Sequence, residues 1–344
     1  MQKRSFILLL GMTVVLLAAA DHALRSGDRA VSPAVHNERL FPELAPHLGD
    51  LAWIRLSRGA TKVNLNLVAA QWAVVEKGNY KAAQGKVRQL LLALAELTLV
   101  EPKTARPELF ARLGLDDPSN GKATLVDLQD RTGKTVAAVI VGKTRHDRLG
   151  DGSDAVYVRR PGEDQTWLAR GSLDLPADVI GWLDRHIIDI PASRIASATL
   201  TAGDGTALTL RRETAAAKFA VLDAPADSKL KGEAAIAEPA GALAALTLDD
   251  VKPAAELPVP QDNVATAVFT TFDGLTITLR LAPRDNAAQS ADWVAVKAAG
   301  SGAAEGEAAA INSRVGRWTY AVPAARAKLL RTTLHDLEAP EKGS

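Results

Sequence analysis

The chain is 344 residues long, which is enough for two domains, and its 47% hydrophobic and 24% charged residues are typical of a folded protein. The 41 basic and 40 acidic residues leave a net charge of +1, which argues against a general nucleic-acid binder because such a protein needs a basic excess. There is no cysteine, which excludes disulfides, thiol catalysis and thiolate metal sites.

Residues 1–24 predict an export signal. Lys3 and Arg4 precede an apolar run over residues 5–20, which is a little shorter than the roughly 20 residues of a membrane-spanning helix. Two interpretations stay open: an uncleaved signal-anchor, or a signal peptide cleaved after the small residues 18–20. We expect an inner-membrane protein with a single span and its bulk in the periplasm, or a periplasmic or secreted protein after cleavage.

Composition divides the rest of the chain into segments. Residues 25–37 are polar and contain glycine and proline, which is typical of a flexible linker. We expect a first α+β domain at 38–191 and a second at 192–338, built from similar repeat units, because a hairpin pattern restarts after the proline at 191. Residues 339–344 are predicted to be a polar tail.

The stretch from Leu51 to Val100 predicts a unit of three strands, a helix and a closing strand. Apolar and polar residues alternate on both sides of Gly59, as in a hairpin, and Trp72–Val75 forms a third short run. Apolar residues at three-and-four spacing over residues 87–97 then predict a helix that covers one face of the hairpin.

The same order recurs at residues 195–248 and again from Val264. Gly203-Asp204-Gly205 and Asp273-Gly274 stand between alternating runs, where the residues of a tight turn take positive φ. We interpret the recurrence as an internal repeat, while any antiparallel protein also repeats hairpins. The predicted fold class is α+β, with repeated antiparallel hairpin or meander units each covered by a helix, after an N-terminal hydrophobic export or anchor helix.

Shorter elements fill the remaining positions. We expect a helix at 107–113 that ends at Gly114, hairpins at 123–141 and 155–169, and helices at 175–183 and 323–337. The alanine- and glycine-rich stretch at 298–310 is expected to be a mobile loop, because it cannot build a core of its own.

No complete catalytic or cofactor-binding motif is present in the sequence. Val141-Gly142-Lys143-Thr144 resembles the end of a phosphate-binding loop, but Ala137 stands where that motif needs its first glycine. There is no Gly-x-Ser-x-Gly, and none of the six histidines has metal-ligand spacing to another; His335-Asp336 are helix neighbours that point in different directions. We therefore predict no catalytic, cofactor-binding or metal-binding residues.

Three polar clusters each have two interpretations. Asp151, Ser153 and Asp154 offer oxygens of the kind that bind calcium, but their spacing departs from an EF-hand loop. Arg145-His146-Asp147-Arg148 is either a solvated loop tip or a partner contact. Trp182, with Asp184-Arg185-His186 after it, is either a core residue or an exposed hot spot.

Short segments spread over the first 200 residues share a pattern with a known family. They are Glu38–Leu44, Trp72–Val74, Val100–Thr104, Leu113–Leu115 with Pro118, Val141–Lys143, Tyr157–Val158, Trp167–Leu168, Trp182–Asp184 and Ile190–Pro191. On these residues the chain resembles the DUF4340 family, well over 38–200 and loosely beyond. The resemblance implies a membrane-anchored extracytoplasmic component found with ABC-type export systems of the gliding-motility or auxiliary type, and it carries over no functional residue.

Three hypotheses about function follow. The first is a non-enzymatic extracytoplasmic accessory or scaffold protein of an ABC-type transport system, held by the inner membrane through its N-terminal segment and bound to a transporter or envelope protein, with no cofactor and no nucleic acid. The second is a periplasmic glycan- or peptide-binding module that uses Trp53, Trp72, Trp167 or Trp293 if these rings are exposed. The third is a hydrolase built from distant carboxylates, which a cleft with two close acidic groups would favour.

Overall fold

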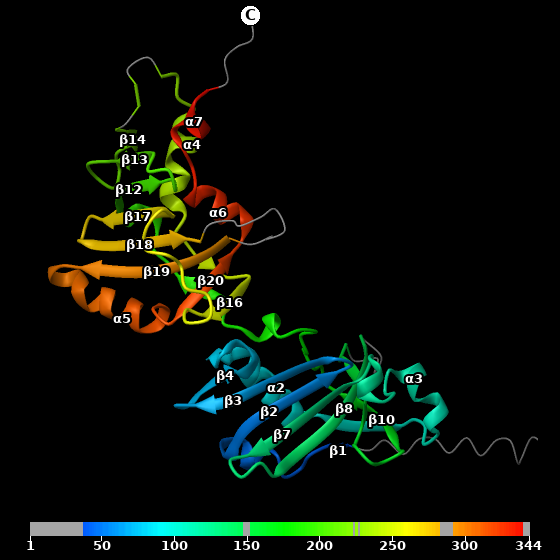
Figure 1. Cartoon of the computed structure of the whole chain (residues 1–344). Coiled ribbons are helices and arrows are strands. Elements are labelled where there is room, and N and C mark those ends of the chain that lie inside the picture. Colours follow the sequence, from blue (N-terminus) through cyan, green and yellow to red (C-terminus); the bar gives the residue numbers. More distant parts are fainter. Residues whose placement is uncertain (1–36, 147–151, 223, 226–227, 283–291, 340–344) are drawn as a thin grey trace, which may run out of the picture. The chain divides into compact units, whose positions relative to one another are not determined.

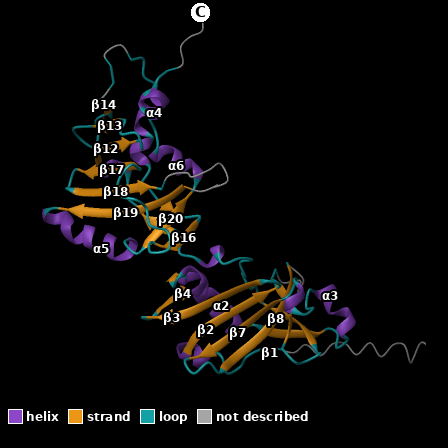
Figure 2. Ribbon diagram, in the orientation of Figure 1, coloured by secondary structure: helices purple, strands orange, loops and turns teal. Residues whose placement is uncertain are grey.

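The structure is a computed structural model that describes residues 37–146, 152–222, 224–225, 228–282 and 292–339. It is an α+β protein, rich in antiparallel strands (Figure 2). The expected export helix, most of the linker, the 147–151 part of the charged loop and the 340–344 part of the tail lie outside the described residues. Among the described helices, none combines the length and the apolar character needed to cross a membrane.

The chain divides into two compact units, and one of them is discontinuous in sequence. Up to Asn64 and again over Arg88–Ala177 the chain belongs to the first unit, while Leu65–Val87 and the chain from Asp178 belong to the second. The expected boundary at residues 191 and 192 stays a prediction.

The first unit is built on one antiparallel sheet in the order β1-β6-β10-β9-β8-β7-β2-β3 (Figure 1). Its strands are β1 (Glu38–Arg39), β2 (Leu51–Arg58), β3 (Thr61–Val68, which enters the second unit at Leu65), β6 (Thr98–Pro102), β7 (Thr124–Asp130), β8 (Thr135–Arg145), β9 (Ala155–Arg159) and β10 (Thr166–Arg170). Between them lie α2 (Gln84–Glu96, which enters the first unit at Arg88), α3 (Phe110–Leu113) and the 3₁₀ turns η1 (Ala45–Asp50), η3 (Pro107–Leu109) and η4 (Pro118–Asn120).

Apolar alternation places the core of the first unit on both sides of this sheet. Ile54 and Leu56 on β2 and Val126 and Leu128 on β7 are buried, and the residues between Ile54 and Leu56 and between Val126 and Leu128 are not. Figure 1 shows α2 running across these strands, and its buried residues recur at helical spacing. A second cluster forms beside α3, from Phe110, Leu115, Ala123, Ile140, Ala155, Tyr157 and Leu168.

The second unit is built on an eight-stranded antiparallel sheet in the order β14-β13-β12-β17-β18-β19-β20-β16, with a separate two-stranded sheet, β11-β15. The strands are β11 (His186–Ile188), β12 (Ile195–Thr201), β13 (Ala207–Arg211), β14 (Ala220–Val221), β15 (Leu246–Thr247), β16 (Asp250–Pro253), β17 (Ala265–Thr271), β18 (Leu275–Leu281), β19 (Asp292–Gly300) and β20 (Trp318–Val322). The helices are α4 (Glu233–Ala237), α5 (Glu305–Val315), α6 (Ala324–Leu330) and α7 (Leu334–Leu337), with 3₁₀ turns η5 (Ile180–Trp182), η6 (Ala192–Arg194), η7 (Pro239–Gly241) and η8 (Gly302–Ala304).

One face of the eight-stranded sheet is buried and the other is half-exposed. On β17 and β18 every second residue is buried, from Ala265 to Thr271 and from Leu275 to Leu281, and the residues between them are threonines, a valine and an arginine. Such alternation is typical of an antiparallel sheet that packs on a core by one face and meets water with the other. We call the half-exposed side the outward face.

Helix α5 packs beside β19 beyond the point where the pairing of β19 with β20 ends. The ladder between β19 and β20 ends at the pair Ala295 and Thr319. At Ala298 the Asn312 side chain takes the place of a strand: the Ala298 N–H donates to Asn312 Oδ1, and Asn312 Nδ2 donates to the Ala298 carbonyl, both at 2.8 Å. A single amide thus satisfies two backbone groups at the end of the sheet.

The prediction of a mobile loop at residues 298–310 is therefore wrong. The stretch holds the end of β19, η8 and the first half of α5, and Ala304 and Ala308 are buried there. Alanine has the highest helix propensity, so this composition suits a helix that packs closely on a strand. Its small side chains gave too weak an apolar pattern for the helix to be predicted.

Residues 65–87 contribute a small hairpin to the second unit. After Leu65 the strand β3 pairs with β4 (Gln71–Val74), which pairs with β5 (Tyr80–Lys81); η2 (Val75–Lys77) lies between them. Within this unit the Tyr80 ring packs edge-on against Trp318 at 4.9 Å and against Tyr320 at 6.2 Å, and Lys77 forms an ion pair with Asp250. Because both tyrosines are buried, this hairpin is held by an aromatic cluster.

The three stretches interpreted as repeats share an order of elements but differ in pairing. In each of them strands are followed by a helix and a closing strand: β2, β3, β4, β5, α2, β6; then β12, β13, β14, α4, β15; then β17, β18, β19, α5, β20. The closing strands pair with β1 and β10, with β11, and with β19 and β16 respectively. Common origin as an internal repeat stays a prediction.

The predicted short helices were partly right. The helix at 107–113 is confirmed: Pro107 opens η3, α3 follows, and Gly114 ends it in a left-handed conformation with φ 70°. The helix expected at 175–183 is reduced to the turn η5. The helix expected from residue 323 to 337 is broken into α6 and α7, because Thr333 starts a new helix with a capping box to Asp336.

Candidate functional site

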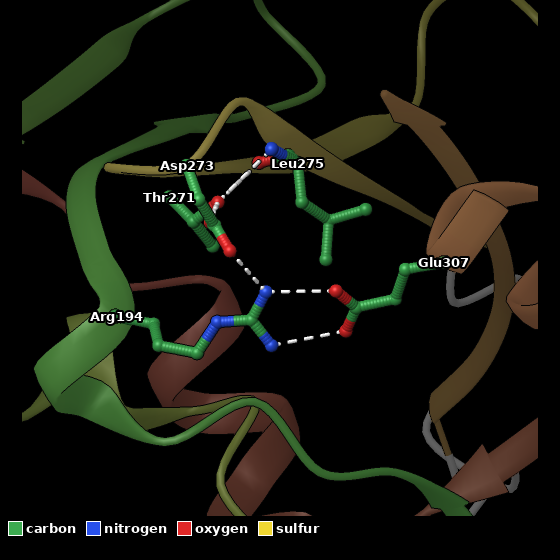
Figure 3. Close-up of polar contacts among 5 residues, drawn as sticks. All are labelled: Arg194, Thr271, Asp273, Leu275 and Glu307. Carbon is green, nitrogen blue, oxygen red and sulfur yellow. Dashed lines mark hydrogen bonds and ion pairs between the residues drawn. The ribbon is translucent and has the colours of Figure 1, made fainter. Parts of the chain in front are cut away.

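One guanidinium in the second unit holds two carboxylates (Figure 3). Arg194, at the end of η6, binds Glu307 on α5 through both of its terminal nitrogens, at 2.9 and 2.8 Å, and binds Asp273 at 2.6 Å. Thr271 orients Asp273, since its hydroxyl donates to the carboxylate and accepts the Leu275 N–H at 3.0 Å. The cluster joins η6, the turn between β17 and β18, and α5.

The geometry keeps both carboxylates ionised. The hydrogen bonds of Arg194 lower the pKa of Glu307, and those of Thr271 and then Arg194 lower the pKa of Asp273. The same bonds, to Glu307 first and Asp273 second, raise the pKa of Arg194. A pair of catalytic carboxylates needs one group with a raised pKa as the proton donor. Asp273 and Glu307 therefore resemble a structural anchor more than an acid–base pair.

A second arginine fixes the same segment of chain. Arg212, after β13, donates to the carbonyls of Ile195 at 2.8 Å, Ala215 at 2.9 Å and Ala192, and its guanidinium lies 4.5 Å from the centre of the Phe219 ring. Burial lowers the pKa of Arg212. The polar groups around η6 are thus engaged in holding the chain.

The outward face carries a different arrangement, in which hydroxyls and cations follow three rows across the strands. The rows are Arg211, Ser197, Thr270, Thr276 and Ala299; Thr209, Thr199, Val268, Thr278 and Lys297; and Ala207, Thr201, Thr266, Arg280, Ala295 and Thr319. All of the charged residues in these rows are basic. These three rows therefore carry only positive charge, although the chain as a whole is nearly neutral. The next row of the outward face, Trp293, Ala321 and Asp250, ends in an acidic residue.

A pocket of about 400 Å³ lies at the end of the third row. Arg280, Ala295, Val296, Lys297 and Thr319 come from the sheet, Asn312 and Gly316 from α5 and its end, Trp318 from β20, and Ala254, Pro258 and Val259 from the loop after β16. The pocket opens along β19 between Ala295, the last residue that pairs with β20, and Ala298, which is hydrogen-bonded to Asn312 of α5. The pocket combines two cations, Arg280 and Lys297, with apolar walls.

The residues that resemble a phosphate-binding loop have a packing role in the first unit. A Cβ on Gly142 would lie 2.5 Å from the Leu113 carbonyl oxygen and 3.0 Å from that of Gly114, so only glycine lets β8 approach the end of α3 this closely. Lys143 Nζ donates to the Arg112 carbonyl at 2.8 Å and so caps α3.

The structure does not gather metal ligands from the described residues, where no group of three or more acidic or histidine side chains has the required geometry. His146 contacts Asp154 at 3.0 Å on the surface, and Asp151 lies outside the described residues. His335 contacts Glu338 at 3.1 Å, while Asp336 caps α7.

Trp182 is a core residue, fully buried in the second unit. The polar residues after it form surface pairs: Asp184 with Lys81 at 2.9 Å, and Arg185 with Asp249 at 2.6 Å. The four tryptophans proposed for glycan binding, Trp53, Trp72, Trp167 and Trp293, are all half-buried. Arg55 lies over the Trp53 ring and Lys252 over that of Trp293, so a neighbouring cation already occupies one side of each ring.

Sequence reasoning missed the Arg194 cluster, the positive rows and the pocket. In the sequence Arg194 is 79 residues from Asp273 and 113 from Glu307. The alternation on β17 and β18 did contain a usable signal, since Thr276 and Thr278 occupy the polar positions of the predicted strand 275–279, and Arg280 follows in the same alternation. The pairing of that strand with β19, which sets Lys297 beside them, was the missing information.

Comparison with known proteins identifies one family. The model of a domain of unknown function, DUF4340, matches residues 72–278. No curated protein and no solved structure matches the chain.

Proposed function

The chain belongs to the DUF4340 family, a family of unknown function, and on that premise we propose that it is a non-enzymatic accessory protein that presents a sheet face to a partner outside the cytoplasm. Its family membership brings no activity with it, so the proposal depends on the surface.

The observation that carries the proposal is the outward face of the eight-stranded sheet. Its rows hold hydroxyls and three cations, Arg211, Arg280 and Lys297, on strands fixed by a packed core beneath. A rigid sheet pays little ordering cost on binding, and rows of one charge sign favour partners of the opposite sign and speed their association. This arrangement suits a docking surface for an acidic partner.

The clustered charges elsewhere support a structural role. The Arg194 guanidinium is hydrogen-bonded to two carboxylates, and that of Arg212 to three backbone carbonyls. A side chain whose hydrogen bonds are already engaged by the protein is a poor candidate for binding a substrate or transferring a proton. The most evident polar groups therefore stabilise the second unit.

The place of action is part of the proposal. The hydrophobic segment at residues 1–24 supports a single inner-membrane span with the bulk of the chain in the periplasm, or export with cleavage of that segment. The partner we propose is a subunit of an ABC-type transport system of the auxiliary or gliding type. That choice is supported by the resemblance to membrane-anchored members of the family.

Crosslinking tests the accessory role. The full chain, tagged at its C-terminus, is crosslinked in native membranes, solubilised in detergent, captured and analysed by mass spectrometry. We expect a transporter subunit to be recovered with it, at a level that rises with crosslinker. Recovery of the chain alone at every crosslinker concentration would overturn the proposal.

The mass of the mature protein tests its location. Intact-mass measurement on membrane and soluble fractions separates the two alternatives, because cleavage after residue 20 removes the apolar run. A full-length mass in the soluble cytoplasmic fraction would contradict both of them.

A further inference from the structure

We propose that the pocket at the end of the outward face binds an acidic, partly apolar peptide segment. The pocket is bounded by Arg280 and Lys297 from the sheet, by Pro258 and Val259 from the loop after β16, and by Trp318. The inference rests on the proposed function only in taking this segment to belong to a partner protein.

The two cations lie where one carboxylate reaches both. Arg280 pairs with Ala295 across β18 and β19, and Lys297 is two residues further along on the same face. Such diagonal neighbours have Cβ atoms roughly 7 Å apart, within reach of long side chains. Arginine and lysine on this spacing converge on a single anionic group.

The charge of these two residues is not neutralised by the described protein. Arg280 donates to the neutral Gln261 side chain, which orients the guanidinium. Lys297 is exposed and forms no ion pair with a described residue. The acidic residues of the neighbouring loop, Glu256 and Asp262, do not line the pocket. A carboxylate from a ligand is therefore the complement that the pocket lacks.

The walls of the pocket are fixed before any ligand binds. The loop after β16 is tied to the sheet by the Thr319 hydroxyl, which donates to the Leu257 carbonyl at 2.9 Å, and by the Ala254 N–H, which donates to the Arg317 carbonyl at 2.9 Å. On the opposite side Asn312 holds α5 to β19. Such preorganisation lowers the entropy that binding costs.

Size and shape favour a peptide over other anions. A volume of about 400 Å³ lies within the range of small-ligand sites and holds two or three residues. The apolar Ala254, Pro258 and Val259 suit aliphatic side chains beside the carboxylate. A membrane surface would meet cations spread over a convex surface, whereas these two lie in a recess.

Fluorescence anisotropy with the purified chain tests the inference. The probe is a dye-labelled hexapeptide of alternating leucine and aspartate, and the control peptide carries asparagine in place of aspartate. We expect the acidic peptide to bind at least about tenfold more tightly, as the loss of one well-formed charge pair implies. Its affinity should fall as sodium chloride is raised, because the site is partly exposed.

Substitutions in the protein localise the binding. Lys297→Glu and Arg280→Gln should each weaken the acidic peptide about tenfold or more, while Lys328→Glu, an exposed lysine of α6 outside the pocket lining, should change its affinity less than about twofold. Circular dichroism and the thermal midpoint establish that each variant is folded. Equal affinity for the two peptides, or an unchanged affinity of a folded Lys297→Glu variant, overturns the inference.

Competition separates the other sources of negative charge. Displacement of the peptide by inorganic phosphate at equal or lower concentration would show a small-anion site, and displacement by vesicles of anionic phospholipid would show a lipid site; either overturns the peptide assignment. The outcome is independent of the crosslinking experiment. Peptide binding without a recovered partner would leave the pocket established and the accessory role refuted, and a recovered partner without peptide binding would do the reverse.

Discussion

Replacement of Asn312 by leucine should destabilise the second unit by removing the amide that ends its sheet. The leucine side chain is similar in size but offers neither a donor nor an acceptor. The Ala298 N–H and carbonyl, each bonded to Asn312 at 2.8 Å, would then have no partner in the gap between β20 and α5. The substitution tests whether the two hydrogen bonds of the Asn312 side chain to the β19 backbone stabilise the edge of the sheet.

The magnitude follows from two lost hydrogen bonds. A typical bond contributes about 0.5–1.5 kcal/mol net, and a buried group left without a partner costs about 1–3 kcal/mol. Asn312 is half-buried, so water can satisfy part of the deficit, and its new apolar side chain can pack against neighbouring apolar groups. We expect a net loss of about 2–3 kcal/mol in the free energy of unfolding.

Equilibrium unfolding in urea, followed by far-UV circular dichroism, measures the loss. Hydrogen exchange of the peptides that contain α5 should show faster exchange in the variant, because the helix is held to β19 at this point. Ser313→Ala is the matched control, since its exposed hydroxyl donates only to the Ala310 carbonyl within the same helix. If Asn312→Leu and the control both fall within about 0.5 kcal/mol of the wild type, the reasoning is refuted.

Three further predictions concern packing and charge. Gly142→Ala places a Cβ 2.5 Å from the Leu113 carbonyl oxygen and should lower the free energy of unfolding, measured by thermal denaturation, by about 1–3 kcal/mol. The control Gly85→Ala, in α2 with open space around it, should leave the stability unchanged or raise it. Equal effects of the two substitutions would contradict this account. Arg194→Met should lower stability at pH 7. The difference from wild type should shrink as the pH falls below 4.5 and 3.8, the ordinary pKa values of Glu307 and Asp273, because these carboxylates, whose pKa values are lowered in the fold, contribute stability only while they are ionised. A difference in urea midpoint that stays constant from pH 7 to about pH 3 would contradict this reasoning. Burial raises the pKa of Tyr320 above its ordinary value of 10.0, so the protonated hydroxyl contributes stability below pH 10 that is lost as the pH rises further. Tyr320→Phe should be less stable than wild type at pH 7 and should lose less stability above pH 10. Equal losses of stability by the two proteins between pH 7 and alkaline pH would count against the buried hydroxyl.

Much of the local structure could be predicted from the sequence. The alternation over β17 and β18, with Asp273-Gly274 between them, marks a hairpin because Gly274 takes φ 89°. Gly114 likewise marks the end of α3. These signals are local, and they are read from neighbouring residues without knowledge of the fold.

The helix α5 was missed for a physical reason. Its buried residues are only Ala308, Ile311 and Val315, which give little hydrophobic contrast, and the residue that fixes it to the sheet is the polar Asn312. A helix that replaces a strand at a sheet edge is specified by hydrogen bonding to a particular backbone position. Sequence periodicity does not report such a contact.

The candidate site could not be predicted because it depends on strand pairing. Lys297 becomes a neighbour of Thr278 and Arg280 only through the register between β18 and β19. The wall of the pocket comes from a loop that Thr319 holds in place. Residue types alone showed a chain with balanced charge, and only the register shows that three neighbouring rows of one face carry only basic charges.

The most direct test of the central claim compares partner recovery by charge-reversal variants. Crosslinking and capture are performed in parallel on the wild type, on Lys297→Glu in the pocket and on Lys328→Glu, an exposed lysine of α6 outside the pocket lining. The account predicts that the wild type and Lys328→Glu recover the same partner equally, and that Lys297→Glu recovers about a tenth as much or less. Equal recovery by all three proteins, or no partner with any of them, would contradict it.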